Sequence, residues 1–150
     1  MQNVSIFHPM LVLVFWTFVI MLFLGYKRFS AVAAKRMKFG YLKVGESEKV
    51  PDDVKVVSRN FINLFEMPVL FYAVCISAYA VHQVTHALLI LAWGYVILRI
   101  VHSLIHVTYN YINQRFLVYA TSCAVLFVMW IIFAVNLQNV STVSKLWPFQ

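Results

Sequence analysis

Charged residues are scarce in this sequence. Only 11% of its 150 residues are charged and 63% are hydrophobic, whereas a soluble domain has roughly 25% charged residues. No Asp, Glu, Lys or Arg occurs from residue 1 to 26, from 67 to 98, or from 116 to 137. Apolar runs of this length are typical of a protein whose solvent is the lipid bilayer.

The sequence also lacks the features of a secreted, disulfide-stabilised protein. Its two cysteines, Cys75 and Cys123, lie inside apolar runs, where a thiol packs as a small apolar group and a structural disulfide is not expected. The first apolar run has no basic flank before it and no small-residue cleavage site after it. We therefore expect this run to be retained as a membrane helix.

The apolar runs predict four membrane helices. Because about 20 residues span a bilayer as a helix, 150 residues hold four spans and one modest loop. The charge-free stretch 67–98 is too long for one span, and the polar segment 82–86 divides it. We predict an all-α, integral membrane four-helix bundle with one domain, residues 1–150, and helices at about 9–37, 53–81, 85–107 and 115–137.

The basic residues are distributed unevenly along the chain. Eight of the 12 Lys and Arg residues lie in the segment 27–55, and only Lys145 lies near the C-terminus. Because basic loops favour the cytoplasmic side of a membrane, we expect this loop and an adjoining site to be cytoplasmic and both termini to be on the outer side. The net charge of +7 could suggest nucleic acid, but the basic residues share no face, and we predict no such partner.

Several ionisable or polar side chains lie inside the predicted spans. A charge there costs on the order of 2.5 to 3.5 kcal/mol unless it finds a partner or a water-filled cavity. In the second helix, Arg59, Asn63 and Glu66 have i, i+4, i+7 spacing, which places them on one stripe. In the third helix, Arg99, His102 and His106 form a similar stripe with i, i+3, i+7 spacing.

The two stripes can be compared by depth because the second and third helices are antiparallel. Arg59 and His106 would both lie near the cytoplasmic boundary. Glu66 and Arg99 each lie seven residues deeper, about 10 Å at helical rise. We therefore predict an ion pair between Glu66 and Arg99.

The fourth predicted helix adds two polar residues at the same boundary. Arg115 begins this helix and Tyr119 lies one turn deeper, so with the two stripes they would form a pocket with surplus positive charge. Arginine forks recognise carboxylates, and such a pocket suits a ligand with several carboxylates, one ammonium and an apolar group. The alternative is that these groups only satisfy one another and orient the helices.

Histidines occur in two pairs with i, i+4 spacing, a spacing that can bind a metal ion from one helix face. His82 and His86 form one pair, and His102 and His106 form the other. His86 and His102 would be about 24 Å apart along the third helix, so the pairs cannot join into one site. We predict no metal site.

Two segments carry a family resemblance: RNFINLFEMPVLFY at 59–72 and RIVHSLIHVTYNYINQRFLVY at 99–119. Both resemble the MAPEG family, the membrane-associated proteins in eicosanoid and glutathione metabolism. Its members include microsomal glutathione transferases, prostaglandin E synthase and a non-catalytic lipoxygenase-activating protein. The resemblance implies a homotrimer of four-helix subunits that uses glutathione as cosubstrate.

The resemblance also implies residue roles. Arg115 would be the catalytic residue, because a nearby cation favours the reactive thiolate of glutathione. Arg99 keeps the family's spacing and is assigned to structure or ligand pairing. One basic residue at the end of the first helix would complete the site; Arg28, Lys35 or Arg36 could serve, and Arg36 is favoured. The expected glutathione-binding residues are Arg59, Asn63, Glu66, His102, His106, Tyr119 and Arg36.

The chain departs from the family pattern in several places. Lys55 and Val56 replace a Glu-Arg pair, Asn60 replaces an Ala, and His106 replaces a Tyr. His106 could still donate a hydrogen bond to a carboxylate. Phe116 stands where prostaglandin E synthase has a Ser, which argues against that specific isomerase.

These observations favour a membrane glutathione transferase, which could also act as a glutathione-dependent peroxidase. It would activate glutathione as a thiolate for attack on a hydrophobic electrophile that arrives from the membrane lipid. The alternative is a non-catalytic lipid-binding or scaffold protein of the same fold. A small transporter has less support, because no broken span or internal repeat is present.

Overall fold

The computed structural model describes residues 4–38, 40 and 50–146 and contains helices and turns, with no strand in those ranges. A single turn of 3-10 helix, η1 (Val4–Ile6), leads into α1 (Phe7–Ala33). The remaining helices are α2 (Asp52–Ala80), α3 (His86–Val107) and α4 (Ile112–Leu146). The predicted all-α architecture is confirmed.

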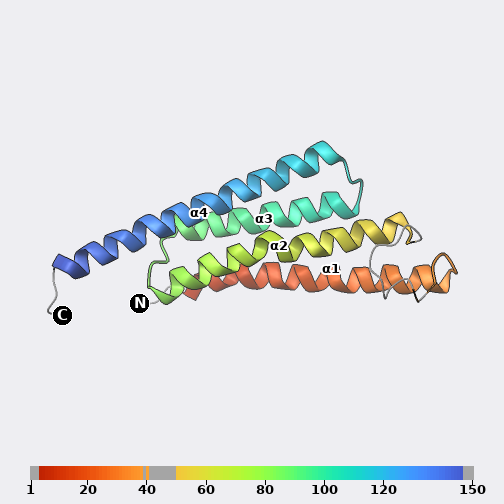
Figure 1. Ribbon diagram of the computed structural model, residues 1–150, viewed down its shortest axis with the longest axis horizontal. Coiled ribbons are helices and arrows are strands. Elements are labelled where there is room, and N and C mark those ends of the chain that lie inside the picture. Colours follow the sequence, from red (N-terminus) through yellow and green to blue (C-terminus); the bar gives the residue numbers. More distant parts are fainter. Residues whose placement is uncertain (1–3, 39, 41–49, 147–150) are drawn as a thin grey trace.

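The four helices run alternately up and down along one long axis (Figure 1). The most extensive packing joins α3 to α4 and α1 to α2, and α2 also contacts both α3 and α4. Figure 1 shows that the start of α4 lies at the same end of the bundle as the end of α1, and that the C-terminal part of α4 extends beyond its neighbours. The topology therefore brings the end of α1, the start of α2, the end of α3 and the start of α4 to the same end of the bundle.

All four helices are long and apolar enough to cross a membrane. The candidate spans within the described residues are Val4–Ala33, Asp52–Ala80, His86–Val107 and Ile112–Gln138. The outward surface is apolar as well, since Phe15, Leu22 and Phe127 are 70%, 68% and 67% exposed. Such exposure is unusual for a water-soluble surface and natural for one facing lipid. The chain is a multi-pass integral membrane protein.

Local sequence features set the helix ends. Asp52 and Asp53 occupy the first turn of α2, where the helix dipole favours negative charge. The Thr85 side chain accepts a hydrogen bond from the Leu88 N–H at 3.2 Å and caps α3. Lys35 has a φ of 55° just after α1, a left-handed conformation that ends helices.

Two helices, α1 and α4, have bounds that differ from those expected. α1 ends at Ala33, not near residue 37, because the Lys35 N–H and the Arg36 N–H bond back to the carbonyls of Val32 and Ala31. α4 begins at Ile112 and continues to Leu146, beyond the expected 115–137. Its polar end contains no Gly or Pro before residue 146, so nothing in the backbone stops the helix.

The buried core includes polar as well as apolar side chains. Phe71 of α2 and Tyr95 of α3 stack with ring centroids 4.6 Å apart and are fully buried. Further along the same helices, the Asn60 Nδ2 donates to the Ser103 Oγ at 2.7 Å, and both residues are 0% exposed. The packing of α2 on α3 is thus apolar near the middle and hydrogen-bonded toward the basic end.

Candidate functional site

A polar pocket of about 220 Å³ lies where α2, α3 and α4 meet. It contains one residue of α2, one of α3 and four from the first turns of α4. None of these lining residues, all within the described part of the chain, is acidic. The lining consists of Asn63, His102, Ile112, Arg115, Phe116 and Tyr119.

Arg115 is held by the turn between α3 and α4. Its Nη1 donates to the Asn110 Oδ1 at 2.6 Å and lies 3.4 Å from the His106 Nε2. Asn110 has a φ of 50°, which Asn tolerates better than most residues. Both side-chain contacts that Arg115 makes with the described residues use Nη1, and Arg115 also lines the pocket.

The partners of His102 and His106 decide their tautomers. The His102 Nδ1 lies 3.1 Å from the Arg115 carbonyl oxygen, which can only accept, so Nδ1 carries a proton and donates. The His106 Nε2 faces a guanidinium, which can only donate, so Nε2 is unprotonated and His106 is neutral. The His102 Nε2 and the His106 Nδ1 are buried without a protein partner among the described residues.

Arg99 is fully buried and does not form the predicted ion pair. Its Nη2 donates to the Asn63 carbonyl at 2.5 Å, and its guanidinium carbon lies 5.4 Å from the Tyr119 ring centroid. Nε and Nη1 are buried without a hydrogen-bond partner in the part of the chain that the structure describes. Glu66 is exposed on α2, so the prediction of an ion pair between Glu66 and Arg99 is wrong for this chain. Equal depth does not make two side chains face each other.

The three polar residues of the α2 stripe do not all face the pocket. Asn63 lines the pocket, whereas Arg59 and Glu66 are exposed on the outside of the helix. At about 100° per residue, Asn63 and Glu66 point some 60° apart, and the edge of the pocket falls between them. Only one of the three expected α2 residues therefore reaches the pocket within its own chain.

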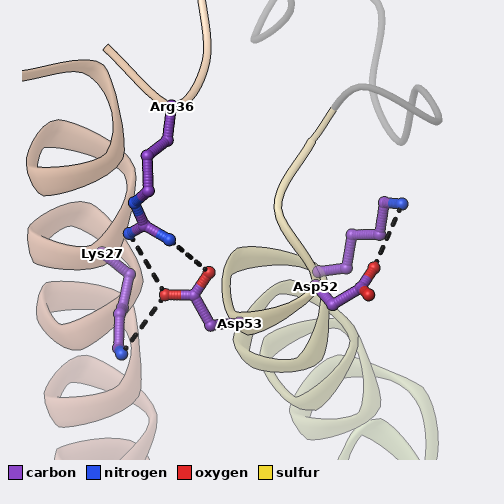
Figure 2. Close-up of polar contacts among 5 residues, drawn as sticks. Lys27, Arg36, Asp52 and Asp53 are labelled. Atoms are coloured by element: carbon purple, nitrogen blue, oxygen red, sulfur yellow. Dashed lines mark hydrogen bonds and ion pairs between the residues drawn. The ribbon is translucent and has the colours of Figure 1, made fainter. Parts of the chain in front are cut away.

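Arg36 lies outside the pocket lining. Its Nη1 and Nη2 contact the two carboxylate oxygens of Asp53 at 3.1 and 3.4 Å, and the Lys27 Nζ lies 3.5 Å from the same carboxylate. Figure 2 shows the two cations on either side of Asp53, joining the end of α1 to the start of α2. Arg36 thus forms an ion pair with Asp53. It lies after the end of α1 at Ala33, although we expected it inside the first helix.

Sequence reasoning missed two polar residues near the pocket. Asn110 holds Arg115 and was not among the expected site residues, although an Asn in a tight turn is a common left-handed residue. Ser103 lies four residues after Arg99, on the same face of α3, and this spacing could have placed it beside the buried polar groups. No three His, Cys, Asp or Glu side chains in the described ranges are grouped to hold a metal ion.

Comparison with known proteins agrees with this fold. A model of the MAPEG family matches residues 6–135, most of the chain. The chain belongs to the MAPEG family. This confirms the resemblance noted in the segments 59–72 and 99–119, and it places both helix stripes, the pocket and Arg115 inside the matched region. No curated protein and no solved structure gives a significant match to this MAPEG chain.

Proposed function

We propose that this MAPEG protein binds glutathione at the polar pocket and activates its thiol for transfer to a hydrophobic electrophile. The observation that carries the proposal is the position of Arg115, an arginine in a pocket lining with no acidic residue. A cation beside a bound thiol favours the thiolate, which is the nucleophile. The thiol proton would go to solvent, and the thiolate would attack an electrophilic carbon and form the new C–S bond, while the bond from that carbon to its leaving group, such as chloride, breaks and the leaving group departs with the electron pair.

The neighbours of Arg115 support this role. His106 is neutral and accepts from the guanidinium, so it positions the arginine without adding charge. Ile112 and Phe116 line the same pocket and are 66% and 68% exposed, so the thiol would meet an apolar surface open to lipid. Phe116, in place of a Ser, supports a transferase over the specific prostaglandin isomerase.

The size of the pocket supports a site that a neighbouring subunit completes, as in the homotrimer that the family resemblance implies. Sites for small molecules typically enclose about 300 to 1,000 Å³, and the pocket of a single chain is about 220 Å³. Arg59 and Glu66 are exposed beside Asn63, where a neighbouring subunit would enclose them with the pocket. A neighbour could also supply a basic residue such as Arg36. We propose that glutathione binds between subunits, with its carboxylates on arginines and its ammonium on Asn63 or Glu66.

Glutathione binding and thiolate formation test the proposal. Addition of glutathione to the purified protein should produce the ultraviolet absorbance of a thiolate. Arg115→Ala should abolish this signal, and Arg115→Lys should retain part of it because charge remains while the planar fork is lost. Lys38→Ala, an exposed basic residue outside the pocket, serves as the matched control. No glutathione binding by the native protein would refute the proposal.

A non-catalytic lipid-binding protein is the second candidate, and an apolar groove between α1 and α2 favours it. Two measurements distinguish these functions. A non-catalytic lipid-binding protein should show no glutathione-dependent thiolate absorbance, and it should not transfer glutathione to a chlorinated nitroaromatic electrophile. Reduction of a lipid hydroperoxide by the same protein would extend the transferase activity to peroxidase activity.

The orientation in the membrane is part of the proposal. The basic end of the bundle, with the pocket, would face the cytoplasm, because basic residues concentrate there. A cysteine placed at the exposed Lys38 should react with a membrane-impermeant maleimide only after sealed cells are opened. Labelling in intact cells would reverse the orientation.

A further inference from the structure

A buried hydrogen bond joins α2 to α3 beside the polar pocket. The Asn60 Nδ2 donates to the Ser103 Oγ at 2.7 Å, and both residues are fully buried. The Asn60 Oδ1 is buried without a hydrogen-bond partner among the residues that the structure describes, so the bond to Ser103 anchors this amide. Because a buried amide without a partner is costly, this bond holds Asn60 toward α3.

The bond adjoins residues that shape the pocket. Ser103 directly follows His102, which lines the pocket. Asn60 lies one turn before Asn63, which also lines the pocket. The Asn63 carbonyl accepts a hydrogen bond from Arg99. A rotation of α2 against α3 would therefore change the pocket lining and the partner of Arg99 together.

The polar residues of α2 lie at successive angles around the helix. At about 100° per residue, Asn63 lies about 60° from Asn60, and Glu66 lies about 60° further in the same direction. In the structure Asn63 meets the pocket and Glu66 is exposed. A rotation of α2 by about 60° would bring Glu66 to the pocket, at the depth of Arg99. It would also move Asn60 about 5 to 6 Å from Ser103, since a helix with its side chains has a radius of about 5 to 6 Å.

We propose that the hydrogen bond between Asn60 and Ser103 sets the rotation of α2, so that Glu66 does not pair with Arg99 and its carboxylate stays available for the ammonium of glutathione. The hydrogen bond and the ion pair need different rotations of α2, so they exclude each other. Asn60 and Ser103 are thus positioning residues that give the pocket its preference for a ligand with a charged ammonium. This preference rests on the proposed glutathione binding, whereas the rotation of α2 does not.

Unfolding without glutathione tests the rotation. Glu66→Gln is introduced into the native chain and into an Asn60→Ala chain, and the denaturation midpoint of each is measured in mixed micelles. In the native chain, where Glu66 is exposed, the midpoint should stay unchanged. In the Asn60→Ala chain, Glu66→Gln should lower the midpoint, because the released helix lets Glu66 pair with Arg99. Ser103→Ala removes the bond from α3 and should give the same result if Asn60→Ala does not fold.

An exchanged pair separates a positioning role from a general loss of stability. Asn60→Ser combined with Ser103→Asn places the amide on α3 and the hydroxyl on α2, which restores a hydrogen bond between the helices. In this chain Glu66→Gln should again leave the midpoint unchanged. Thr121→Ala is the matched control, because its hydroxyl donates to a carbonyl of its own helix, and it should also leave the midpoint insensitive to Glu66→Gln.

Ligand selectivity tests the consequence for the pocket. The native protein should bind glutathione more tightly than N-acetylglutathione, in which an amide replaces the ammonium. Asn60→Ala should reduce the ratio of the two affinities about tenfold, the order of one hydrogen bond to a charged group. The exchanged pair should restore the ratio, and Thr121→Ala should not change it.

Three results would overturn these statements separately. If Glu66→Gln leaves the midpoint unchanged in the Asn60→Ala and Ser103→Ala chains, apolar packing alone sets the rotation and the positioning role is wrong. A lowered midpoint with an unchanged affinity ratio would show that the bond sets the rotation but not the ligand preference. If the native protein binds neither ligand, the proposed function fails, while the unfolding measurement still decides the rotation.

Discussion

The effect of Arg99→Met on the unfolding free energy distinguishes two arrangements of the buried Arg99: an ion pair with Glu66, and the contacts with Asn63 and Tyr119 that the structure shows. If Arg99 were paired with Glu66, Arg99→Met would leave an unpaired carboxylate and cost about 3 to 5 kcal/mol of unfolding free energy. In the structure, the substitution removes a hydrogen bond from a charged group to the Asn63 carbonyl, worth about 1.5 to 3 kcal/mol. It also removes the contact with the Tyr119 ring, worth about 0.5 to 2 kcal/mol.

A compensating gain comes from the two guanidinium nitrogens, Nε and Nη1, for which residues 4–38, 40 and 50–146 offer no hydrogen-bond partner. A buried polar group without a hydrogen bond costs about 1 to 3 kcal/mol, and Arg99→Met removes both nitrogens. The gain and the losses are of similar size. We therefore expect Arg99→Met to change the unfolding free energy by less than about 2 kcal/mol, the residual of these opposing contributions.

Glu66→Gln is the decisive companion variant. Glu66 is exposed in the single chain, so we expect a change in unfolding free energy within about 0.5 kcal/mol, although glutathione affinity should fall if Glu66 binds the ammonium. Both variants are measured by denaturation in mixed micelles without glutathione. A loss of about 3 to 5 kcal/mol in each single variant, with a milder double variant, would refute the structural description and restore the ion pair.

Three further outcomes follow from individual contacts. Ser103→Ala should cost about 1 to 3 kcal/mol of unfolding free energy in the same assay, because it leaves the buried Asn60 amide without its acceptor. The control is Thr121→Ala, which should change the unfolding free energy little, because Thr121 is exposed and its hydroxyl donates to a carbonyl of its own helix. Asn110→Gly should weaken glutathione binding measured by calorimetry, because it removes the acceptor for Arg115 while Gly keeps the left-handed backbone; unchanged affinity would show that Arg115 needs no support from the turn. Asp53→Asn should lower the unfolding free energy by less than about 1 kcal/mol, because the ion pairs of Asp53 are partly exposed to solvent. This loss should become smaller in high salt, which screens the ion pairs. A larger loss would mean that this carboxylate sets the packing of α1 on α2.

Much of the pocket could be predicted from spacing. Arg115 and Tyr119 lie one turn apart at the start of a helix, and His102 lies one turn from Arg99, so the helical period alone places them near each other in depth. All but Arg99 line the pocket, and the Arg99 guanidinium carbon lies 5.4 Å from the centroid of the Tyr119 ring. Depth was predictable because the connections from α2 to α3 and from α3 to α4 are short and these helices are antiparallel.

The direction in which each helix faces was not predictable from spacing. Asn63 and Glu66 share a stripe in the sequence, yet only Asn63 meets the pocket, because the rotation of α2 is set by its packing on α1 and α3. Arg36 was expected inside a helix, but the turn at Lys35 directs it to Asp53. Such turns depend on a balance of a few hydrogen bonds, which local propensity does not resolve.

The sequence by itself determined that the chain crosses a membrane four times, because the cost of burying charge in lipid is large enough to show in composition alone. It also determined that polar groups collect near the basic end. Only the tertiary structure decided which of these groups meet, since the rotation of each helix about its own axis depends on side-chain packing with its neighbours. That rotation separates Arg99 from Glu66 and leaves Arg115 in a pocket lined by no acid.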